Sequence, residues 1–168
     1  MMRAMKFASA STAKIVSIAD AVRQAKKARA QGKRIVTTNG CFDLLHVGHL
    51  KSLEFAKAQG DILIVGVNAD AWIRKYKKRE SIVPARERAQ MIAAFASVDH
   101  VFIFTSATPH AWLARIKPHV HVKGTDRAIA GGRLIESDVV EAHGGRVVFF
   151  PHTGKHSTRA MIQRAQKL

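Results

Sequence analysis

The chain has 168 residues, of which 47% are hydrophobic and 24% charged, and its formal net charge is +16 at pH 7. This length fits one domain with its own core, and the balance of apolar and charged residues is typical of a folded protein. No apolar run approaches the roughly 20 residues that span a bilayer. The single cysteine, Cys41, excludes an intramolecular disulfide framework and favours a reducing, cytoplasmic location.

The excess of basic residues has three candidate explanations: nucleic-acid binding, attraction to an anionic membrane surface, or steering of anionic small substrates. Basic residues are spread along the chain, with one dense cluster at residues 74–79. The sequence has few aromatic residues to interleave with them and no recognisable nucleic-acid-binding module. We therefore rank phosphate-bearing small substrates first, a solvated basic surface second and nucleic acid third.

Helical and strand patterns alternate along the chain. Residues 1–13 are predicted to form a flexible extension, because they are basic, rich in Ser and Ala and free of acidic residues; residues 14–168 form the domain. Helices are predicted at 18–31, 47–58, 84–96, 108–116, 138–143 and 157–167, and strands at 34–38, 62–67, 101–104, 120–123 and 146–150.

Short apolar strands separated by helices predict a parallel sheet covered on both faces. The expected fold is therefore α/β, a single Rossmann-like doubly wound domain with a five-stranded parallel sheet and its ligands at the carboxyl ends of the strands. The G-x-G-x-x-G fingerprint is absent after the first strand, which disfavours a dehydrogenase-type dinucleotide site.

The stretch RIVTTNGCFDLLHVGHLK, residues 34–51, carries the main chemical signal. A strand is predicted to turn through Asn39-Gly40 into a helix whose first turn bears His46 and His49. Residues three apart on a helix share a face, and Gly48 between them lets a phosphate approach the backbone. The helix start adds unpaired N–H groups and a partial positive charge, so the stretch predicts a polyphosphate site. An H-x-G-H match alone is weak, and its place at a strand-to-helix turn carries the prediction.

The stretch GCFDLLHVGHLKSLEFAKAQGDILIVGVNAD resembles the signature of the cytidylyltransferase-like nucleotidyltransferases. Within them it most resembles the heptose 1-phosphate adenylyltransferases of lipopolysaccharide-core synthesis, which also occur as the second domain of a bifunctional heptose kinase/adenylyltransferase. The resemblance runs from about residue 14 to residue 166. It includes VKGTD at 122–126, VVEAHGGRVV at 139–148 and GKHSTRAMI at 154–162.

The resemblance implies an enzyme that transfers AMP from ATP, with Mg²⁺, to D-glycero-β-D-manno-heptose 1-phosphate, and it implies a homodimer. The residues that it implies fall into three sets: catalytic His46, His49 and Lys51; nucleotide-binding Asn39, Gly40, Cys41, Phe42, Gly48, Lys77, Arg88, Gly154, Ser157 and Thr158; and acceptor-binding Asp43, Lys123, Gly124 and Asp126. No protein side chain is assigned to the metal.

Structural alternatives stand beside several of these roles. Lys51 is equally explained as an exposed helix lysine, Arg88 as a partner in a helix-surface salt bridge, and Ser157 as an N-cap. Asp43 is expected mainly to organise its loop, with indirect contact to magnesium as the alternative. Lys77 is placed in a loop after the second strand.

The chain departs from the family at several positions. Glu80-Ser81 stands where Arg-Pro is common, Arg159 where a second threonine is usual, and Thr125 and Arg127 where a glycine and an aromatic are usual. These differences leave the acceptor open. A glycerol-3-phosphate cytidylyltransferase-type enzyme and a non-catalytic nucleotide- or RNA-binding module on the same fold remain as alternatives. His119 and His121 alternate on a strand and are a possible metal pair, but no third ligand has clear spacing.

Overall fold

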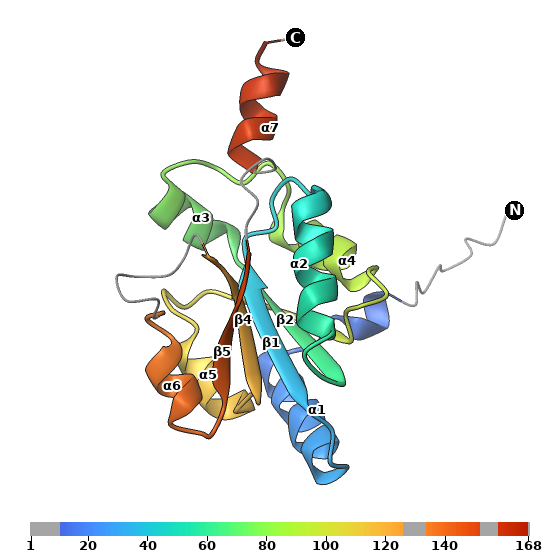
Figure 1. Cartoon of the computed structure of the whole chain (residues 1–168). Coiled ribbons are helices and arrows are strands. Elements are labelled where there is room, and N and C mark those ends of the chain that lie inside the picture. Colours follow the sequence, from blue (N-terminus) through green and yellow to red (C-terminus); the bar gives the residue numbers. More distant parts are fainter. Residues whose placement is uncertain (1–10, 126–133, 152–157, 168) are drawn as a thin grey trace, which may run out of the picture.

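Five parallel strands form the centre of the protein, in a computed structural model that describes residues 11–125, 134–151 and 158–167, apart from the side chain of Arg159. The strands are β1 Ile35–Gly40, β2 Ile62–Asn68, β3 His100–Phe104, β4 Val120–Gly124 and β5 Arg146–Phe150. Their order is β3-β2-β1-β4-β5, and every pair is parallel (Figure 1). The predicted α/β, doubly wound, five-stranded fold is confirmed.

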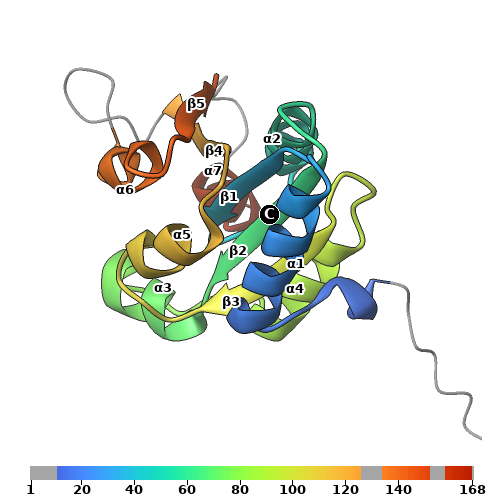
Figure 2. The ribbon, with the colours of Figure 1, turned by 90° about the horizontal axis from the view of Figure 1, so that it is seen from below.

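Helices cover both faces of this sheet. They are η1 Thr12–Lys14, α1 Ile18–Ala30, α2 Val47–Lys57, α3 Asp70–Lys77, α4 Ala85–Ala93, α5 His110–Ile116, α6 Ser137–Glu141 and α7 Thr158–Ala165. The buried residues of α2 and α4 pack in one core, and those of α1, α5 and α6 in another. In Figure 2, α5 and α6 lie on one side of the strands and α2 and α4 on the other.

Successive side chains of each strand point to opposite faces of the sheet, so each strand contributes residues to both cores. Val36 of β1 and Leu63 of β2 face α2 and α4, whereas Ile35 and Ile64 face α1 and α5. Successive side chains of a strand point to opposite faces, so strands buried on both faces read as continuous apolar runs. That is why these strands were recognisable from the sequence.

Two details of the predicted elements are wrong. Asn39 and Gly40 are the last residues of β1 and not a turn, which follows at residues 41–45, with Phe42 at φ 50°. Lys77 is not in a loop, because it ends α3. The basic cluster hid this helix, although Arg and Lys are good helix formers and the fully buried Ile73 anchors it.

The N-terminal boundary is described only in part. Residues 1–10 of the expected extension lie outside the described residues. Beyond them η1 begins at Thr12, and Ile15 bridges to Val101 of β3, so the chain reaches the sheet before α1. Among the described helices, none combines the length and apolar character that crossing a membrane requires.

Candidate active site

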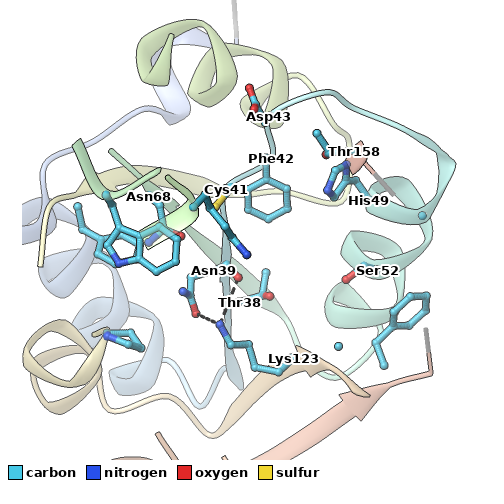
Figure 3. Close-up of a pocket in the computed structure, with 18 of the residues that line it drawn as sticks. Thr38, Asn39, Cys41, Phe42, Asp43, His49, Ser52, Asn68, Lys123 and Thr158 are labelled. Carbon is cyan, nitrogen blue, oxygen red and sulfur yellow. Dashed lines mark hydrogen bonds between the residues drawn. The ribbon is translucent and has the colours of Figure 1, made fainter. Parts of the chain in front are cut away.

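A cavity of about 700 Å³ opens at the carboxyl edge of the sheet. It lies where the strand order reverses: β2 and β3 follow β1 on one side, and β4 and β5 lie on the other. Such a switch point is where doubly wound sheets bind ligands, because the loops diverge there. Side chains from β1, α2, α3, β4 and α7 line the cavity (Figure 3).

The two motif histidines meet at the wall of this cavity. His46 is the N-cap of α2, and its carbonyl accepts a hydrogen bond of 2.9 Å from the N–H of His49. The two rings stack with centroids 3.9 Å apart and an interplanar angle of 22°. His46, Gly48 and His49 all line the cavity, so the predicted convergence of the imidazoles is confirmed.

A tight turn brings the end of β1 under these rings. The Phe42 ring lies 5.3 Å from that of His49, and its backbone has a positive φ. A Cβ added at Gly40 would lie 3.2 Å from the Phe42 ring, so a side chain there would displace it. Asn39, Gly40, Cys41 and Phe42 all line the cavity, and their role in nucleotide binding stays a prediction.

Asp43 fastens this turn to the segment after α3. One carboxylate oxygen accepts from Arg79 Nη1 at 2.5 Å, and the other accepts from the N–H groups of Ile82 and Val83 at 3.0 Å. The Asp43 side chain is only 1% exposed. Although Asp43 lines the cavity, these bonds favour its expected role as loop organiser over acceptor binding.

Arg88 supports the same turn from behind. Its guanidinium is fully buried and donates to the carbonyls of Val83 and Cys41 and to the Asp70 carboxylate. Burial raises the pKa of Asp70, but hydrogen bonds from Ala85 N–H, Arg88 and Ser81 together bring it below its usual value. Arg88 does not line the cavity. Arg88 therefore fits neither the expected nucleotide contact nor the expected helix-surface salt bridge. It is a buried residue that stabilises this turn.

Lys51 points away from the cavity. It is exposed on α2 and is absent from the lining, whereas Ser52 lines it. Residues two apart on a helix face nearly opposite directions, and those three apart share a face. The structure therefore places Ser52, rather than Lys51, on the side of His49.

Lys123 occupies the floor of the cavity beside Gly124. Its ammonium donates to Asn39 Oδ1 at 2.8 Å (Figure 3). The same ammonium lies 3.7 Å from a carboxylate oxygen of Glu136. Sequence reasoning missed Glu136, and with it two other lining residues, Asn68 and Trp72. Asn68 had a usable signal, because it directly follows a predicted strand and so falls at the ligand edge.

The start of α7 reaches the β1–α2 loop. Thr158 Oγ1 donates to the carbonyl of Leu44 at 3.5 Å, and Thr158 lines the cavity, as does Lys77. Figure 3 shows Thr158 beside His49. The predicted site residues Gly154, Ser157 and Asp126, and the altered position Arg127, lie outside the described residues.

His119 and His121 both contact residues of β1. His119 Nδ1 accepts from the N–H of Ile35, and His121 Nδ1 lies 2.8 Å from Thr37 Oγ1. Complete burial, with Lys123 nearby, pushes the pKa of His121 well below its usual value. The described part of the chain contains no group of three or more His, Cys, Asp or Glu residues able to hold a metal.

Comparisons with known proteins agree with this geometry. The profile of the family described as cytidylyltransferase-like matches residues 37–147. Curated relatives include the "Bifunctional protein HldE" of Alkalilimnicola ehrlichii, 48% identical over 83% of this chain and 29% of the relative. That of Geotalea uraniireducens is 41% identical over 92% of this chain and 31% of the relative. The chain thus spans less than a third of the length of these relatives.

Solved structures share the fold. A lipopolysaccharide core biosynthesis protein from Thermoplasma volcanium superposes with a TM-score of 0.61 and 23% identity, over 72% of this chain and 97% of that one. A pantoate-beta-alanine ligase from Francisella tularensis gives a TM-score of 0.59 and 15% identity, over 91% and 76%. From the profile match, which covers most of the domain and includes the histidine pair, the chain belongs to the cytidylyltransferase-like family.

Proposed function

We propose that the chain transfers AMP from ATP to D-glycero-β-D-manno-heptose 1-phosphate, giving ADP-heptose and pyrophosphate for lipopolysaccharide-core synthesis. The observation that carries this proposal is the stacked His46–His49 pair at the start of α2, inside the cavity at the switch point. Family membership supports nucleotidyl transfer. The VKGTD and GKHSTRAMI stretches, and the similarity to HldE proteins, support the heptose acceptor.

In this reaction an oxygen of the acceptor phosphate attacks the α-phosphorus of ATP in line. A bond forms between that oxygen and the α-phosphorus, the bond to the bridging oxygen of the β-phosphate breaks, and pyrophosphate leaves with its electron pair. The enzyme must hold two anions together and stabilise charge on a crowded phosphorus. Positioning and fixed electrostatics therefore supply most of the acceleration.

The cavity offers groups for both tasks. His46 and His49 are placed to donate hydrogen bonds to the phosphates of ATP and to the charge that develops on the α-phosphate. The His46 side chain makes no capping hydrogen bond to the first N–H groups of α2, which leaves them able to bind a phosphate. Lys77 and Thr158 can hold the remaining phosphates, and Lys123 adds positive charge at the floor.

We infer that magnesium enters this site with ATP. The described residues hold no cluster that could cage a metal, and the Asp43 oxygens are already bonded to Arg79 and two backbone N–H groups. Mg²⁺ is commonly bound through substrate phosphates and waters, and there it would neutralise the charge of the leaving pyrophosphate. The proposal also includes a cytoplasmic homodimer; equilibrium sedimentation of the purified chain would measure the dimer.

Pyrophosphate release tests the reaction. The chain is incubated with Mg²⁺, with ATP or CTP, and with the heptose 1-phosphate or glycerol 3-phosphate. Release is expected with ATP and the heptose phosphate. Release only with CTP and glycerol 3-phosphate would replace the proposal with a cytidylyltransferase, and ATP binding without turnover of any acceptor would make the chain a binding module.

A further inference from the structure

Three polar side chains cross the sheet in one row at the cavity. Asn39 of β1 pairs in register with Gly66 of β2, and Asn68 is two residues beyond Gly66, so Asn39 and Asn68 share a face. The register of Thr38 with Val122 puts Lys123 beside Asn39 on that same face. This is the face covered by α1 and α5, because Ile35 and Ile64 point the same way.

The histidine pair lies at the other end of the cavity. Its helix, α2, packs on the opposite face of the sheet. Figure 3 shows Phe42 between His49 on one side and Asn68 on the other. One ligand can therefore extend from the α2 side, where phosphates are expected, across the strand ends to the polar row.

Asn68 is the residue of this row that lacks a partner. It is 4% exposed and lines the cavity, yet its side chain has no hydrogen bond to any residue that the structure describes. By contrast, Asn39 accepts from Lys123, and the nearby Thr38 hydroxyl donates to the Val122 carbonyl. None of its amide atoms is completely buried, so the amide faces the open cavity, where it can both donate and accept. A ligand with hydroxyl groups would satisfy it.

Trp72 and Glu136 complete the same end. Trp72 Nε1–H donates to the carbonyl of Ala107 at 2.9 Å, and the Tyr76 ring packs 4.9 Å from the indole, so both contacts fix the indole where it lines the cavity. Glu136 is 6% exposed, and its one charged partner among the described residues is Lys123, at 3.7 Å, longer than a hydrogen bond. Its carboxylate therefore still has capacity to accept from hydroxyl donors.

We propose that Asn68, Trp72 and Glu136 form the subsite for the polyhydroxylated ring of the acceptor, with Asn68 as its specificity-determining residue. Adjacent hydroxyls can accept from and donate to the Asn68 amide, Glu136 accepts from others, and the apolar face of the ring packs on Trp72. A short acyclic acceptor has too few hydroxyls to pair with all of these groups, and a site built to hydrogen-bond hydroxyls rejects analogues that lack them. The inference rests on the proposed function for its ligand.

Binding measurements test the subsite apart from turnover. Titration calorimetry is done on the full chain with heptose 1-phosphate and with glycerol 3-phosphate, in saturating α,β-methylene-ATP, which cannot release pyrophosphate. Asn68→Ala should weaken heptose 1-phosphate binding about tenfold, the upper range for one hydrogen bond, and leave glycerol 3-phosphate unchanged. Gln24→Ala, an exposed amide on α1, is the matched control, and thermal melts check that each variant is folded.

The ribose of ATP also carries adjacent hydroxyls, so its affinity is measured in the same variants. The affinity for α,β-methylene-ATP should stay within about twofold in Asn68→Ala. Heptose 1-phosphate should quench tryptophan fluorescence in the wild type and not in Trp72→Phe. The subsite is overturned if Asn68→Ala binds heptose 1-phosphate as the wild type does, or weakens the ATP analogue instead. Asn68-dependent binding without pyrophosphate release would refute the proposed function and leave the subsite standing.

Discussion

Replacing the buried Arg88 with methionine should destabilise the protein without removing a ligand contact. The guanidinium is 0% exposed and donates to two carbonyls and the Asp70 carboxylate. Methionine fills much of the same volume but donates nothing. The carbonyl of Cys41 would then lose the donor that holds the turn below His49.

The size of the effect follows from these contacts. Each carbonyl that loses its donor costs about 1 kcal/mol, and the ion pair adds about 1 kcal/mol, because Asp70 is 36% exposed and water can replace Arg88 there. The loss of roughly 3 kcal/mol is below the 5–15 kcal/mol stability of typical domains, so the variant should still fold. For this size of domain the melting temperature should fall by about 6–12 °C.

Urea denaturation and thermal melts followed by circular dichroism measure this loss. Arg88→Lys keeps the charge but not the several N–H donors of the planar guanidinium, so its free energy of unfolding should fall by about half as much. ATP affinity, measured by calorimetry below the melting transition, should change by less than about threefold in both variants. Unchanged stability together with a large loss of ATP affinity would refute this reasoning and return Arg88 to the nucleotide site.

Three further predictions concern the site and the sheet. His49→Ala should lower kcat for pyrophosphate release about 100- to 1,000-fold, as for loss of one oxyanion donor. Lys51→Ala should keep kcat/KM within about threefold in the same assay, because Lys51 faces away from the cavity. Because the pKa of His121 is lowered in the folded chain, the free energy of unfolding should decrease as the pH falls below about 6.5. In that range the unfolded chain binds a proton at this residue and the folded chain does not. Between pH 6.5 and 5.5 this costs about 1 kcal/mol in urea denaturation, and His121→Asn should remove that difference.

Each of these has a clear contrary outcome. A His49→Ala variant that releases pyrophosphate at the wild-type rate would exclude that imidazole from the chemistry. A hundredfold loss in Lys51→Ala would mean that α2 presents a different face to the ligand. His100 and His119 also have lowered pKa values, so a pH dependence that is identical in wild type and His121→Asn would assign the effect to them.

Local sequence patterns were sufficient for most of the fold and for the phosphate end of the site. β5 was predicted at its observed bounds, and α2 to within one residue, because apolar periodicity and a glycine stop are local features. The spacing of His46 and His49 likewise fixes their common face once a helix begins there. The histidine pair could therefore be predicted without knowing any long-range contact.

The sequence by itself determined the parallel sheet, the alternating helices and the paired imidazoles, since each depends on residues within a few positions of one another. Only the tertiary structure decided that Arg88 is buried and stabilises the turn, that Lys51 faces solvent, and that Asn68 and Lys123 line one cavity from the two strands beside β1. These roles depend on contacts between segments distant along the chain, and on which side of a strand or helix faces its neighbours. Burial and strand order set them, and neither can be read from local spacing.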